Sequence, residues 1–121
     1  QINRTVIYNN MCRFFERLDV LACPVVGCMP PPQTEEWVSE VGGVRLTGYM
    51  DWLRFAFLAT TTGLPAISVP VGPGPRGLPI GIQLIGKPRG EAALLAAAAA
   101  FEPVPGGPNT PIAPPRRGSS A

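Results

Sequence analysis

The sequence contains no histidine. Histidine is the base of Ser-His-Asp and Cys-His catalysis and the commonest zinc ligand, so its absence excludes those hydrolases and most zinc sites. The three cysteines, Cys12, Cys23 and Cys28, include no C-x-x-C pair. We expect them to be free thiols that pack as small hydrophobic side chains in a reducing, cytoplasmic compartment, and we expect neither a metal nor a cofactor.

Charge is sparse as well. Charged residues make up 15% of the chain, the net charge is +2, and the basic residues form no stripe interleaved with aromatic residues. This pattern argues against a nucleic-acid partner. The longest apolar run, residues 92–101, has about half the length that a membrane-spanning helix needs. The chain has no secretory signal. It opens with Gln1 and not with an initiating Met, so we expect Gln1 to be an internal position of a longer protein.

Hydrophobic residues, at 45%, are plentiful for a chain with so few charges. We therefore expect a domain over residues 1–102 whose apolar surface is completed by further chain. The composition then changes to Pro, Gly, Ser and Arg, which predicts a flexible tail over residues 103–121.

Apolar residues at helical spacing predict an amphipathic helix over residues 4–18, with Phe14 and Phe15 against a sheet. Asp19 ends this helix, and residues 20–23 read as a buried strand because no polar residue alternates within them. The proline-rich stretch 24–32 is expected to be extended and irregular. The apolar stripe of the helix comprises Ile7, Met11, Phe14, Phe15 and Leu18.

The middle of the chain is expected to be a loop over residues 33–47 with a short strand at 44–46. Residues 49–62 lack Gly and Pro and are apolar most of the way round, which predicts a helix in the core. Gly63 is its natural end, and Pro65 prevents its resumption.

Two strands follow, over residues 66–71 and 80–85, and the turn residues between them predict an antiparallel hairpin. Pro70 lacks a backbone donor and is expected at a bulge or facing away from a neighbour. An Ala-rich helix is predicted over residues 91–102, with Leu94, Leu95, Ala98 and Phe101 on one face. The element order gives an α/β fold, a mixed sheet with covering helices.

Three segments in this order resemble the C-terminal end of the amidase-signature family of serine amidohydrolases. The first is FFERLDVLACPV at residues 14–25, a helix running into a strand and a proline-rich loop. The second runs from YMDWLR at 49–54 to TTTGLPAISVP at 60–70, and the third comprises GLPIGIQLIG at 77–86 with the helix that follows. The resemblance covers residues 4–102.

The resemblance implies amide hydrolysis by a Ser–cis-Ser–Lys triad, in which a lysine acts through a bridging serine on the nucleophilic serine. It also implies that the triad lies upstream of these residues. The only lysine here is Lys87, and no serine lies in a glycine- and serine-rich segment. We therefore assign no catalytic residue, no substrate-binding residue and no metal ligand, and we expect the chain alone to be inactive. The serines are Ser39, Ser68, Ser119 and Ser120.

Four other features have both a functional and a structural interpretation. Asp51 is expected to start a helix rather than to contact substrate, and the threonines 60–62 to bond their own backbone. Glu35 and Glu36 are expected on a solvated loop. Residues 72–77 lack the strand-to-helix context of a phosphate-binding loop.

Two functional hypotheses remain open at this point. In the first, the chain is the C-terminal part of an amidase and contributes scaffold and pocket wall, and its partners are a small amide substrate and either the remaining amidase chain or a companion subunit. In the second, it is a stand-alone, non-catalytic interaction module or a truncated or split subunit that binds a partner through its apolar surface.

Overall fold

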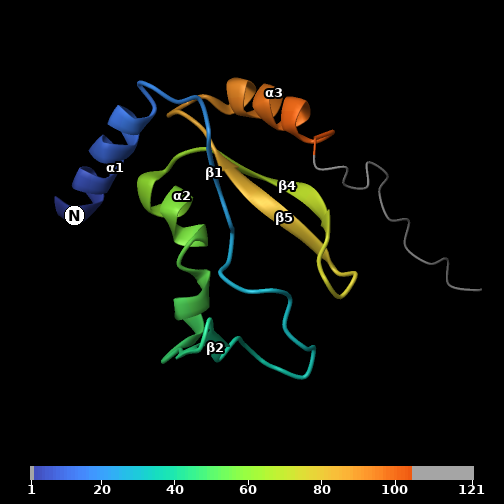
Figure 1. The fold of residues 1–121 in the computed structure, drawn as a ribbon. Helices are drawn as coiled ribbons and strands as arrows, with labels where there is room; N and C mark the ends of the chain where they lie inside the picture. Colours follow the sequence, from blue (N-terminus) through green and yellow to red (C-terminus); the bar gives the residue numbers. More distant parts are fainter. Residues whose placement is uncertain (1, 105–121) are drawn as a thin grey trace, which may run out of the picture.

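The computed structural model of the chain describes residues 2–104. The order of elements confirms the predicted helix, strand, irregular stretch, helix, two strands and helix (Figure 1). The short strand expected at 44–46 forms at Val44–Arg45, as one half of a small hairpin whose other strand was not predicted. All but the first two residues of the predicted tail, 103–121, lie outside the described residues. The elements are α1 (Ile2–Phe14), β1 (Leu21–Cys23), β2 (Glu40–Val41), β3 (Val44–Arg45), the 3₁₀ helix η1 (Tyr49–Leu53), α2 (Ala56–Thr62), β4 (Ala66–Pro73), β5 (Pro79–Ile85) and α3 (Glu91–Phe101).

The main sheet has the strand order β1-β5-β4, and each pairing is antiparallel. The predicted hairpin is confirmed: Ala66 lies opposite Ile85, and the ladder continues to Pro73 opposite Pro79. The register shifts between Pro70 and Gly72, so the expected bulge follows the proline that lacks a ladder donor. The sheet with its helices confirms the predicted α/β class, although the described pairings are all antiparallel and not the mixed set that was expected.

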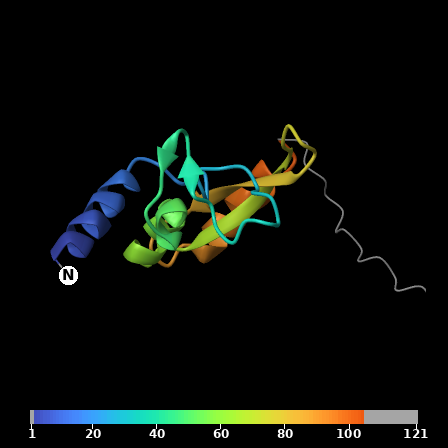
Figure 2. The same ribbon diagram turned by 90° about the horizontal axis from the view of Figure 1, so that it is seen from below.

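Helices cover both faces of the sheet. Neighbouring residues of β5 point to opposite sides, and each side packs against a different helix or pair of helices. Leu84 packs with Val69 and with Leu94 of α3. Ile85 is fully buried on the other face, in a cluster whose remaining buried members are Phe15, Ala59 and Leu64. Figures 1 and 2 show α1 and α2 together near one end of the hairpin and its turn at the other. Within residues 2–104, no helix combines the length and apolar character needed to cross a membrane.

The first helix ends earlier than predicted. α1 stops at Phe14, and Glu16 and Arg17 make tight turn bonds, from Glu16 N to Arg13 O and from Arg17 N to Phe14 O. Because the helix has ended, Leu18 leaves the predicted apolar stripe and its side chain is 50% exposed. Phe15 is buried against the sheet as expected.

The predicted buried strand at 20–23 is also wrong in one respect. β1 forms, but its three residues are half-buried or exposed. The reason is that β1 is an edge strand, paired on one side with β5.

The predicted helix over residues 49–62 is divided into η1 and α2, with Arg54 and Phe55 between them. Phe55 is 48% exposed and η1 has no buried residue, so the expectation that this whole segment lies in the core is wrong. The predicted end is confirmed: Gly63 adopts the left-handed conformation at φ 66°, and Leu64 N bonds Ala59 O at 3.2 Å.

α3 forms as predicted, with one of its four expected face residues misplaced. Leu94 and Ala98 are buried against the sheet, whereas Leu95 is 59% exposed. Successive helical residues are turned by about 100°, so Leu95 points away when Leu94 packs inward.

Candidate functional site

Two cavities lie on either side of the Trp52 side chain. The loop cavity, about 470 Å³, is bounded by residues 24–31, Trp52, Ser68 and residues 79–81 of the hairpin. The η1 cavity, also about 470 Å³, lies among the small β2–β3 hairpin, η1 and Phe55. Trp52 is thus a wall shared by both, a role that its sequence position did not reveal.

The hairpin holds the proline-rich loop that bounds the loop cavity. Arg76, near the hairpin turn, donates from a guanidinium nitrogen to the carbonyl oxygen of Pro30 at 2.8 Å. Burial raises the pKa of the Cys28 thiol, so this cavity-lining thiol stays uncharged at neutral pH and is a poor nucleophile. The three cysteines are free, as predicted.

Asp51 organises the turn that carries Trp52. One carboxylate oxygen, Oδ2, accepts bonds from the Thr47 hydroxyl at 2.9 Å, the Thr47 N–H at 3.1 Å and the Gly48 N–H at 3.2 Å. The other, Oδ1, accepts a bond from Arg54 at 3.2 Å. These partners start η1, which is the role expected for Asp51 from the sequence.

The bonds to Asp51 predict a specific acid sensitivity. The Thr47 hydroxyl bond, followed by the Thr47 N–H and the Arg54 bond, lowers the Asp51 pKa below its ordinary 3.8. Because the folded pKa is the lower one, the stabilisation is complete above about pH 3.8 and is lost as the pH falls through the folded value. In Asp51→Asn, we expect this component of the pH dependence to disappear. Urea midpoints measured from pH 6 to pH 2 test it, and parallel curves for the two proteins would contradict it.

Trp52 has an unpartnered donor. Its indole Nε1 is buried, and no described residue accepts a bond from it, whereas the ring makes an edge contact with Tyr49 at a centroid distance of 6.1 Å. Buried indole N–H groups are normally paired, so this donor is available to an acceptor that the described residues do not supply.

Ser68 and Lys87 do not lie together. Ser68 is in the middle of β4, opposite Gln83, and its hydroxyl oxygen lies 3.0 Å from the point where a Cβ on Gly81 would be. Lys87 lies four residues beyond Gln83 along the chain, past the end of β5 at Ile85. Its Nζ bonds Asp19 Oδ1 at 3.2 Å. The geometry offers no Ser–Lys pair for proton transfer between these two.

The other candidate residues named from the sequence have structural roles or lie exposed to solvent. The Thr62 hydroxyl donates to the carbonyl oxygens of Leu58 at 2.7 Å and Ala59 at 3.2 Å, as expected for a threonine at a helix end. Glu35 and Glu36 are exposed, as predicted for a solvated loop. No group of three or more His, Cys, Asp or Glu side chains suited to a metal ion occurs among residues 2–104.

The sequence model of the Amidase family matches residues 1–95. This chain belongs to the amidase family. The match includes the loop cavity, η1 and the β4–β5 hairpin, and it confirms the resemblance read from the three motifs.

Individual relatives of this amidase-family chain agree with the family match. A fatty acid amide hydrolase from Oryza sativa subsp. indica is 44% identical over 101 residues, which are 82% of this chain and 16% of that protein. One subunit of the glutamyl-tRNA(Gln) amidotransferase from Geotalea daltonii is 41% identical over 99 residues, 82% of this chain and 19% of that protein.

A solved structure shows the same fold. A bacterial aryl acylamidase of the amidase-signature family superposes with a TM-score of 0.69 at 32% identity, covering 82% of this chain and 21% of that one. This amidase-family chain therefore corresponds to about a fifth or less of the length of these relatives.

Proposed function

We propose that this chain is the C-terminal α/β segment of an amidase that hydrolyses a carboxylic amide to an acid and an amine or ammonia. The observation that carries the proposal is the family match over residues 1–95, in a chain that spans 16% of the rice fatty acid amide hydrolase. The segment, residues 1–102, supplies strands, covering helices and part of a pocket wall. The Ser–cis-Ser–Lys triad and the rest of the pocket belong to the remaining amidase polypeptide.

The arrangement of polar groups supports a wall without catalytic residues. Lys87 is engaged with Asp19 in an exposed ion pair, and Ser68 has no lysine or other base near it in the β4–β5 ladder. A triad lysine must accept a proton through hydrogen-bonded serines, whereas the hydrogen bond that Lys87 makes among the described residues is to Asp19. We therefore expect the 121-residue chain alone to be inactive.

Trp52 and the loop cavity are the part of this chain best suited to form the pocket wall. The cavity is mostly apolar, as small-molecule pockets are, and its shape depends on the bond from Arg76 to Pro30. The buried, unpaired indole N–H of Trp52 supports the idea that further amidase chain or a small amide substrate meets this wall. Three free thiols suit a cytoplasmic location. The remaining amidase is either the rest of the same polypeptide or a companion subunit.

Single substitutions in the full polypeptide test the absence of catalytic residues here. We expect Ser68→Ala and Lys87→Ala each to retain kcat/KM for a simple aryl amide within about threefold of the parent, because neither side chain touches the reacting atoms. The matched control removes the lysine of the triad in the remaining polypeptide and should abolish hydrolysis. A loss greater than about a hundredfold in Ser68→Ala or Lys87→Ala would place that residue in the catalytic machinery.

A further inference from the structure

α1 is attached to the described fold by only part of its surface. Met11 and Phe14 pack against the buried cluster around Ile85, and Arg4 Nε donates to the Thr61 carbonyl oxygen at 2.7 Å. Residues 3–10 are all exposed, including Val6 at 52%. Most helices are stabilised by packing of an apolar face, so a helix with this exposure lacks part of its packing.

The exposed side of α1 that carries Val6 continues into a groove at the C-terminal end of the helix. Val6, Asn10 and Phe14 follow one another at the i, i+4 spacing that places side chains on one side of a helix. The groove has a volume of about 690 Å³. We call it the α1 groove, and its lining comprises Asn10, Arg13, Phe14, Glu16, Arg17 and Leu18.

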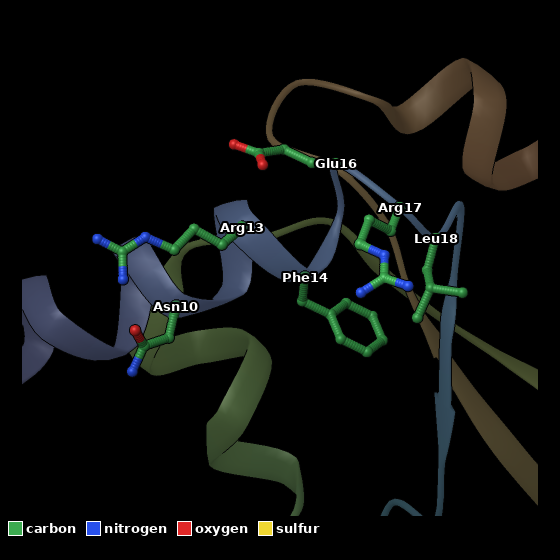
Figure 3. A pocket seen from close by; sticks show the side chains of 6 residues that line it. All are labelled: Asn10, Arg13, Phe14, Glu16, Arg17 and Leu18. Atoms are coloured by element: carbon green, nitrogen blue, oxygen red, sulfur yellow. The ribbon is translucent and has the colours of Figure 1, made fainter.

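The groove combines an apolar floor with positive charge. Figure 3 shows the Phe14 ring close to the side chains of Arg17 and Leu18, with Asn10 and Arg13 extending from α1 farther away and the Glu16 carboxylate apart from them. Leu18 is 50% exposed. Among the described residues, neither Arg13 nor Arg17 forms an ion pair. Guanidinium groups beside apolar surface are typical partners of carboxylates.

We propose that a segment of the remaining amidase polypeptide covers the α1 groove, with apolar side chains on Phe14 and Leu18 and a carboxylate on Arg17. This inference rests on the proposed function, because it takes the occupant from the same amidase. The length of chain required exists in the relatives, of which these residues span 16–19%. The groove has two arginines without an ion pair against one glutamate, which favours a segment that carries an acid over a purely apolar one.

Zero-length cross-linking of the full polypeptide tests the carboxylate. Arg17→Lys keeps the charge and adds an amine that carbodiimide couples to a neighbouring carboxyl group. We expect a linked peptide from outside residues 1–121, formed within one molecule. Asn9→Lys is the matched control: Asn9 is turned from Phe14 by about 140° on the same helix, so that link should be absent. Links confined to residues 1–121, links that double the mass by joining two copies, or no link at all would overturn the proposal.

A second pair of variants tests the apolar floor. Leu18→Glu should lower the thermal midpoint of the full polypeptide by at least about 2–4 °C, whereas Asn9→Glu should change it little. Equal shifts would contradict a covered groove. Amide hydrolysis is assayed on the same samples. A link in Arg17→Lys together with an inactive parent polypeptide would refute the proposed function alone, whereas an active parent polypeptide and no link in Arg17→Lys would refute this inference alone.

Discussion

Ile85→Ala should lower the free energy of unfolding by about 2–5 kcal/mol, the range for truncating a buried aliphatic side chain. Ile85 is fully buried, at the point where β5 meets Phe15, Ala59 and Leu64. Truncation of its side chain leaves a cavity where α1, α2 and the sheet meet. The measurement is urea unfolding of the polypeptide that carries these residues.

Leu95→Ala is the matched control for Ile85→Ala. It removes an aliphatic side chain that is 59% exposed, and we expect a change within about 0.5 kcal/mol. If the two substitutions cost the same, Ile85 would not be at the centre of the core.

Leu94→Ala should release α3 from the sheet. Leu94 is 4% exposed and packs with Val69, Leu84 and Ala98, so truncation should again cost about 2–5 kcal/mol. A Cβ on Gly86 would lie 3.2 Å from the Leu94 Cβ, which shows how closely the helix approaches the end of β5.

Hydrogen exchange separates this effect from global unfolding. In Leu94→Ala we expect the backbone amides of α3 to exchange at least about 30-fold faster, while those of α2, packed on the opposite face, change much less. Uniform acceleration across both helices would contradict the division of the core into two clusters.

The second half of the fold could be predicted from the sequence because its signals are local. The hairpin follows from alternating strands around a Gly/Pro-rich turn, and Gly63 marks the end of α2. α3 follows from an Ala-rich run after Gly90. In these segments local preference and tertiary packing favour the same structure.

The first half of the fold was less predictable, because tertiary and side-chain contacts determine where its helices and strands begin and end. Composition alone supports a continuous helix over residues 49–62, whereas the bonds of Asp51 to Thr47, Gly48 and Arg54 fix a separate η1. The β2–β3 hairpin was only half predicted, although a signal for it exists. Gly42 and Gly43 both have positive φ, at 58° and 80°, which is typical of a two-residue hairpin turn.

The candidate wall required the structure. Nothing in the sequence around Trp52 shows that two cavities meet at its ring, because one boundary comes from residues 24–31 and another from the hairpin. The bond from Arg76 to Pro30 joins residues 46 positions apart, so no local pattern indicates it. The family could be read from the sequence because its three motifs lie in order along the chain.

The intact mass of the native polypeptide that contains these residues is the most direct test of the central claim, that they form part of an amidase whose triad lies elsewhere. We expect a mass several times 12.8 kDa, with a Ser–cis-Ser–Lys triad upstream of Gln1. A mass near 12.8 kDa would contradict the claim.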